Sequence, residues 1–133
     1  TEIAAELRKH DISDLKLPAM FLSSDCIYSN ILEDNTENLK SISLSYRTKK
    51  LSGQMSVSRF YSEEIIPPVD FHNTTSYSQA EEFTVNGLTV FVIEQGDFCS
   101  IAYQDNLIQY MMYLNTDFAS AIEIAKTISD TES

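Results

Sequence analysis

The 133-residue sequence has no tryptophan, only three glycines, three prolines and two cysteines. With so little glycine the chain is not collagen-like, and two cysteines cannot build a disulfide-dense scaffold. No apolar run approaches the roughly 20 residues of a membrane-spanning helix. The sustained heptads of a coiled coil are also missing. What remains is a globular domain.

Positive charge is scarce as well, since nine Lys and Arg stand against 20 Asp and Glu, giving a net charge of −11. This field repels phosphate backbones, so no nucleic-acid partner is predicted. The longest basic cluster, residues 47–50 (Arg-Thr-Lys-Lys), is interpreted as the flank of a turn. The length fits a single domain over residues 1–133.

Helical patterns lie near both ends of the chain. Residues 2–9 are strong helix formers with acidic residues first and basic residues last, which suits the helix dipole. Pro18 then favours an extended segment, so residues 1–22 are predicted as a helix followed by such a segment. Near the other end, capping residues precede an apolar stripe with helical spacing, which predicts a helix over residues 116–129.

Between these helices, residues 23–114 are predicted to form a sheet. Apolar and serine residues alternate over 41–47, as in a half-buried strand, and residues 54–61 continue a similar two-residue alternation. An earlier, less regular strand is expected around 26–32, and residues 69–80 are interpreted as a loop. The dipeptide Asn86-Gly87 favours a tight hairpin, and short polar turns then separate strands over 88–93, 98–103 and 107–114. The predicted fold class is α+β: an antiparallel meander sheet with N- and C-terminal helices packed on one face.

Residues suited to catalysis are few. His10 and His72 are expected at the surface, and no HExxH, GxSxG, glycine-rich phosphate loop or EF-hand loop occurs. Residues 13–16 match the bare Ser-x-x-Lys spacing of penicillin-recognising enzymes, but the partner motifs of those enzymes are missing. No catalytic residue, cofactor or metal is therefore predicted. The pairs Glu63-Glu64 and Glu81-Glu82 are typical of a solvated acidic rim, although paired carboxylates also occur in hydrolases.

The two cysteines, Cys26 and Cys99, are flanked by apolar residues. Two buried free thiols are the plainer interpretation. A disulfide is the alternative, and it would indicate an oxidising compartment.

Aromatic residues are concentrated in the last strands, which are apolar on both faces. Such a sheet must be covered on both sides by a helix, a second sheet or a partner. We therefore predict a ligand or partner face, while core packing is the competing interpretation. The residues of this predicted face are Phe91, Ile93, Tyr103, Tyr110 and Met112.

The order of segments also follows a family pattern. After Leu17-Pro18 and the first strands, a strand with a hairpin glycine (83–90) is followed by a strand with an aromatic (100–105), a strand reading Gln-Tyr-Met-Met-Tyr-Leu (109–114) and a helix reading Ile-Ala-x-x-Ile (124–128). The third of these strands reads Tyr-x-Leu in the family pattern. This order resembles the DUF4367 family of small bacterial domains, best over residues 83–129. Ala102-Tyr103 stands where the family often has tryptophan.

The resemblance implies an extracytoplasmic domain tethered to the cell membrane through an upstream helix absent from this chain, in an anti-sigma-factor-like or lipoprotein-like parent. We accordingly predict a non-enzymatic sensor or interaction domain that binds a protein or a small apolar ligand. The alternatives are a carrier of a small molecule, lipid or peptide on the apolar sheet face, and a small acidic hydrolase using carboxylates of residues 63–82. A structural module that pairs through an edge strand is a further alternative.

Overall fold

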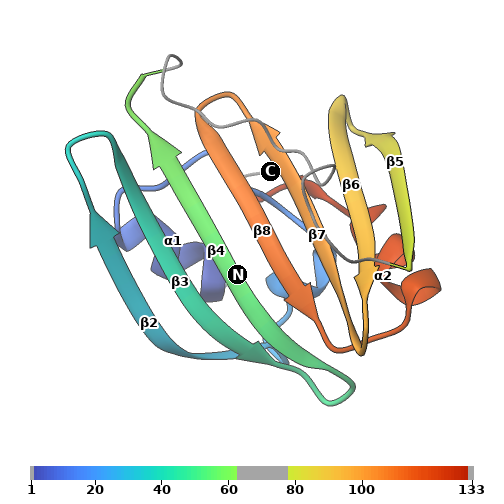
Figure 1. Ribbon diagram of the computed structural model, residues 1–133. Helices are drawn as coiled ribbons and strands as arrows, with labels where there is room; N and C mark the ends of the chain where they lie inside the picture. The colour runs from blue at the N-terminus through green and yellow to red at the C-terminus, as the bar shows by residue number, and fades with distance from the viewer. Residues whose placement is uncertain (1, 63–77, 132–133) are drawn as a thin grey trace.

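The computed structural model describes residues 2–62 and 78–131. Its main element is a seven-stranded antiparallel sheet in the order β2-β3-β4-β8-β7-β6-β5 (Figure 1). The fold is α+β with an antiparallel sheet, as predicted. The strands are β2 (Ile27–Asn35), β3 (Leu39–Arg47), β4 (Ser52–Phe60), β5 (Gln79–Val85), β6 (Leu88–Gln95), β7 (Phe98–Asp105) and β8 (Ile108–Leu114).

The sheet is not one continuous meander, because β4 pairs with β8 and the next strand in the chain, β5, forms the far edge. This order places the apolar strands β7 and β8 in the middle of the sheet, where both faces can be covered. It leaves the acidic residues Glu81 and Glu82 exposed on an edge strand, where charge discourages further strand pairing. In the loop predicted over 69–80, Gln79 and Ala80 belong to β5, and residues 69–77 lie outside the described residues.

Local sequence explains the hairpins well. Asn86 and Gly87 adopt the positive φ angles of 49° and 83° that a type I′ turn requires. The strand predicted around 26–32 is β2, which runs on to Asn35 and has a register irregularity between Ser29 and Leu32. Asn30 has a φ of 55° within this irregularity.

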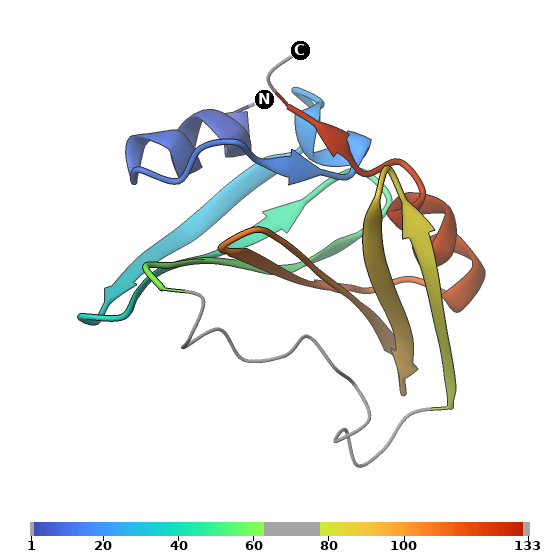
Figure 2. The ribbon, with the colours of Figure 1, turned by 90° about the horizontal axis from the view of Figure 1, so that it is seen from above.

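The remaining elements come from the two ends of the chain. Helix α1 (Glu2–Lys9) has the predicted bounds, and a short 3₁₀ helix, η1 (Ala19–Leu22), follows it. Helix α2 (Phe118–Ala125) is capped by Asp117, whose carboxylate accepts a hydrogen bond from the Ser120 amide. Figure 2 draws α1 and η1 above β2 and β3, and α2 next to β6.

The predicted C-terminal helix over 116–129 is too long, because α2 ends at Ala125. Beyond it, β9 (Ser129–Asp130) pairs antiparallel with β1 (Lys16–Leu17) as a separate two-stranded sheet. The amide of Thr131 also donates to the Leu15 carbonyl. These backbone bonds between the two ends of the chain replace the last helical turn, an outcome that periodicity alone cannot foresee.

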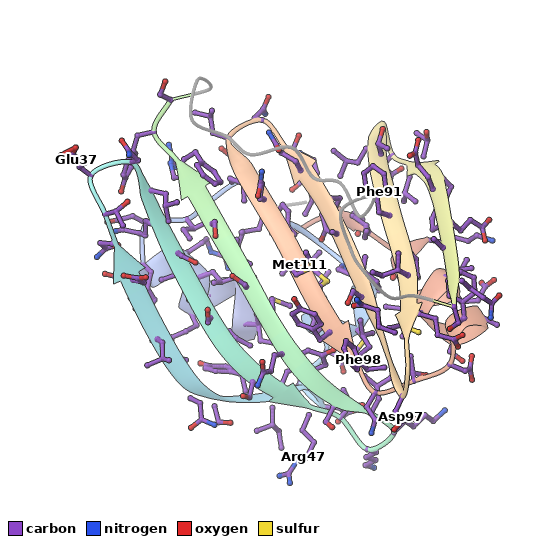
Figure 3. All side chains as sticks on the ribbon, in the orientation of Figure 1. Glu37, Arg47, Phe91, Asp97, Phe98 and Met111 are labelled. Carbon is purple, nitrogen blue, oxygen red and sulfur yellow. The ribbon has the colours of Figure 1, made fainter. Side chains whose placement is uncertain are left out.

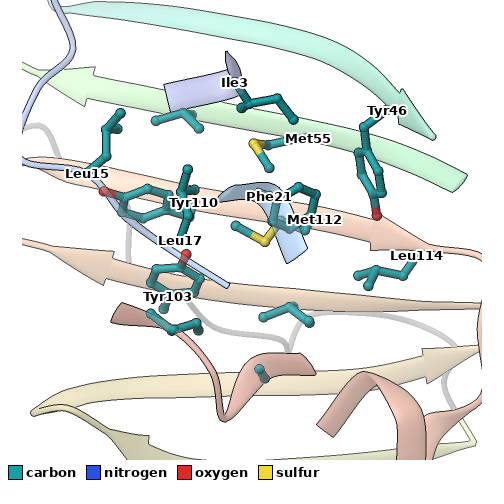
Figure 4. Close-up of a cluster of buried hydrophobic side chains, with 14 of the residues drawn as sticks. Ile3, Leu15, Leu17, Phe21, Tyr46, Met55, Tyr103, Tyr110, Met112 and Leu114 are labelled. Carbon is teal, nitrogen blue, oxygen red and sulfur yellow. The ribbon is translucent and has the colours of Figure 1, made fainter. Parts of the chain in front are cut away.

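One buried cluster joins the terminal elements to the sheet (Figure 4). We call the sheet face that contributes to it the inner face, and the opposite face the outer face. The register aligns an apolar row across five strands of the inner face: Leu44, Met55, Met112, Ile101 and Val92. From the terminal elements, Ile3, Leu7, Phe21, Ala121 and Ala125 join the same cluster.

Candidate functional site

Three of the five residues of the predicted binding face belong to the buried cluster of the inner face. Tyr103, Tyr110 and Met112 are at most 1% exposed on the inner face. The rings of Tyr103 and Tyr110 stack with centroids 4.5 Å apart. These three residues therefore follow the core-packing interpretation, because large apolar side chains are most stable when they are buried.

The two tyrosine hydroxyls bind the backbone of Lys16 in β1. Tyr103 donates to the Lys16 carbonyl oxygen at 2.6 Å, and the Lys16 amide donates to the Tyr110 hydroxyl oxygen at 3.0 Å. Burial raises the pKa of both phenols above the ordinary value of 10. Both hydroxyls therefore stay neutral and act as structural hydrogen-bonding groups.

The other two predicted residues, Phe91 and Ile93, lie on the outer face, because they pair with Ala102 and Ser100 of β7. Phe91 is half-buried and Ile93 is buried. Figure 3 looks onto this face and labels Phe91, Met111 and Phe98 on it. The five predicted residues thus divide between the two faces of the sheet and do not form one surface.

The titratable residues singled out in the sequence are dispersed. Glu81 and Glu82 are successive strand residues, so their side chains point to opposite faces. Glu63, Glu64 and His72 lie outside the described residues. His10 lies between two carboxylates, with Nδ1 2.5 Å from Glu33 and Nε2 3.2 Å from Glu6.

Both cysteines are free and buried. Burial raises the pKa of each thiol. The Cys99 thiol donates to the Thr116 carbonyl oxygen at 3.4 Å. Cys26, by contrast, lines a cavity.

This cavity has a volume of about 700 Å³ and is open to solvent. Its size falls within the range of roughly 300–1,000 Å³ typical of small-molecule sites. The walls come from the η1 region, the turn between β3 and β4, and α2. The side chains that line it are Met20, Ser23, Asp25, Cys26, Thr48, Lys49, Lys50, Leu51, Thr116, Ala119, Ser120, Glu123 and Ile124.

The cavity exists because the covering layer is made from two ends of the chain. Strands β1 and β9 join these ends, and the Ala19 amide donates to the Thr127 hydroxyl oxygen at 2.9 Å. The open space lies between Met20 of η1 and residues of α2 that include Ala119 and Ile124. Small residues on α2, Ala119 and Ser120, keep that wall open.

The composition of the lining is uneven. Met20, Leu51 and Ile124 provide apolar surface, while Lys49 and Lys50 are exposed at the turn between β3 and β4. Two acidic residues, Asp25 and Glu123, also line the cavity. Glu123 lies 3.7 Å from the Lys126 ammonium, one turn along α2.

A second hollow, of about 430 Å³, lies on the outer face over β2, β3, β4 and β8. Its lining combines uncharged polar residues, among them Ser43, Ser45 and Gln54, with the apolar side chains of Leu32 and Tyr113. The first cavity is larger and offers more apolar surface, which makes it the better match to a small-molecule site.

None of the cavity residues was predicted as a site. The cluster at residues 47–50 was correctly interpreted as a turn flank, but its neighbours in space come from residues 20–26 and 116–124. The sequence signal that could have indicated this site was a basic turn in a strongly acidic chain. The sequence did not show which segments fold against that turn.

Within residues 2–62 and 78–131, no group of three His, Cys, Asp or Glu side chains could hold a metal ion. No helix in the same ranges is long and apolar enough to cross a membrane.

Comparison of the chain with protein-family models, with curated proteins and with solved structures found no match.

Proposed function

We propose that this chain is a non-enzymatic binding domain, and that the cavity between η1, the β3–β4 turn and α2 holds a small, largely apolar ligand. The observation that carries the proposal is the cavity itself, with its volume of about 700 Å³ and its lining of Met20, Leu51 and Ile124. Solvent-exposed apolar concavities of this size are where small molecules bind. The site differs from the sheet face that the sequence suggested.

The fold gives this proposal a physical basis. We take the two terminal helices as packed on one face of the sheet, so that the covering layer has a seam between η1 and α2. The seam is held at one end by the pairing of β1 with β9. A ligand in the cavity would contact both sides of the seam and stabilise the folded state by mass action.

The wider role we propose is that of a sensor or interaction domain, extracytoplasmic and tethered through its parent protein. This part rests on the resemblance to DUF4367 over residues 83–129. Ligand binding at the seam between η1 and α2 suits a sensor, because a bound ligand would change the contacts between these two elements. Localisation of the full-length parent, with protease accessibility of this domain in intact cells, tests the extracytoplasmic placement; protection of the domain would overturn it.

The binding proposal is tested with the neutral apolar fluorophore N-phenyl-1-naphthylamine. The wild-type domain is expected to bind it saturably at one site. Ala119→Trp should abolish binding, because the indole would fill the cavity from an exposed position on α2. Ala5→Trp is the matched control, since Ala5 is an exposed helical alanine on α1 away from the cavity.

Binding to Ala5→Trp but not to Ala119→Trp would support the proposal, provided that both variants unfold at similar urea concentrations. Equal binding to the two variants would place the site elsewhere. Absence of binding to the wild-type domain, together with native mass spectra free of adducts, would overturn the proposal and favour a protein-interaction module.

A further inference from the structure

We infer that the ligand of this cavity is a single-chain amphiphile with an anionic headgroup, and that Lys49 and Lys50 hold the headgroup while the hydrocarbon chain lies between η1 and α2. This inference rests on the proposed function and adds the chemical class of the ligand. It is argued from the distribution of charge around the cavity.

The first step concerns the lysines. All six lysines of the chain lie in the described residues, and Lys9, Lys16, Lys40 and Lys126 each form an ion pair with a carboxylate. Lys49 and Lys50 form none within residues 2–62 and 78–131. Of the six lysines, these two are the ones without a carboxylate partner in the described residues, and both line the cavity. They are free to take an anion from outside the chain.

The second step concerns the acids that share the cavity. Glu123 lies near Lys126, and Asp25 follows η1, so the negative lining residues come from the other two walls. An anion would be repelled by these two carboxylates and attracted by the lysine turn. The charge distribution therefore fixes which wall the headgroup contacts.

The third step concerns the space next to the lysines. Leu51 directly follows Lys50 and lines the same cavity, with Met20 and Ile124 also in the lining. Cations adjacent to apolar surface match a molecule that has one charged end and a long apolar part. A fully polar anion would leave this apolar lining exposed, and an uncharged hydrocarbon would leave the lysines without a partner.

The experiment compares two ligands of equal chain length, dodecanoate and dodecanol, by displacement of N-phenyl-1-naphthylamine below their aggregation concentrations. Two exposed ion pairs correspond to a preference of roughly two- to thirtyfold, so dodecanoate should bind more tightly than dodecanol by that factor. The preference should shrink as salt is raised, because the headgroup lies near solvent. Shortening the chain to decanoate should weaken binding roughly tenfold or more, since each buried methylene contributes about fourfold.

The variant Lys49→Gln/Lys50→Gln should lose the preference for dodecanoate and keep the affinity for dodecanol. Its matched control is Arg8→Gln/Lys9→Gln, which also lowers the net charge from −11 to −13 by removing two positive charges from an exposed segment. The control should keep the preference. Loss of the preference in both variants would attribute it to net charge and overturn the inference.

Equal binding of dodecanoate and dodecanol to the wild-type domain would also overturn the inference while leaving the proposed function intact. Binding of neither ligand, with no binding of the fluorophore, would overturn both. Dodecyl phosphate distinguishes the headgroup source: tighter binding than dodecanoate would identify a phosphate headgroup, and weaker binding a carboxylate.

Discussion

The hydroxyl of Tyr103 offers the sharpest test of how this fold is held together. Tyr103 is fully buried, stacks on Tyr110 and donates to the Lys16 carbonyl oxygen at 2.6 Å. Tyr103→Phe keeps the ring, its volume and its stacking, and removes only this donor. The substitution therefore isolates the bond that ties β1 to the centre of the sheet.

The expected cost follows from the fate of the Lys16 carbonyl. Removing one partner of a buried hydrogen bond costs about 1–3 kcal/mol, because the remaining group loses its partner without regaining water. For a chain of this length, that loss corresponds to a fall in Tm of roughly 3–10 °C. Tyr110→Phe should give a similar loss, because it leaves the Lys16 amide without the Tyr110 hydroxyl.

Urea unfolding followed by circular dichroism measures this cost. Tyr113→Phe is the matched control, since Tyr113 is 39% exposed on the outer face, and its substitution should change the free energy of unfolding by less than about 0.5 kcal/mol. The slope with urea should be the same for all variants. If Tyr103→Phe proved as stable as Tyr113→Phe, the argument that Tyr103 anchors β1 would be refuted.

Three further predictions concern stability and titration. Gly53→Ala should destabilise by about 3 kcal/mol in urea unfolding, because a Cβ at Gly53 would lie 1.7 Å from the Tyr113 carbonyl oxygen. Gly87→Ala, with φ of 83° but open space around it, should cost only about 1 kcal/mol; equal costs would contradict the clash. The hydrogen bond to Glu33, followed by that to Glu6, raises the pKa of His10 above 6.5, so its NMR titration midpoint should exceed 6.5 and fall in Glu33→Gln. The stability due to this pair is complete below pH 6.5 and is lost as the pH rises through the raised pKa; an unchanged midpoint in Glu33→Gln would refute the coupling. Burial raises the pKa of Tyr46 above 10, so the stability that its neutral phenol contributes is present below pH 10 and is lost as the pH rises further. In Tyr46→Phe the free energy of unfolding should fall less steeply with pH above pH 10 than in the wild type. An equally steep fall in both proteins would refute this prediction.

Local sequence was sufficient for the elements whose cause is local. Residues 2–9 carry helix formers and favourable terminal charges, and they form α1 with those bounds. Asn86-Gly87 can adopt the positive φ angles of a tight hairpin, and the two strands that it joins pair as predicted. Alternation of serine with apolar residues likewise located β3 and β4, because side chains on a strand point alternately to its two faces.

Tertiary structure alone decided the features that bear on function. The pairing of β4 with β8, and of β1 with β9, joins segments far apart in the chain, and no short-range pattern specifies such partners. The burial of Tyr103 and Tyr110 depends on Lys16 lying above them, since its backbone groups satisfy both hydroxyls. The cavity is bounded by three separate segments, so composition could supply its lysines and apolar side chains but could not bring them together.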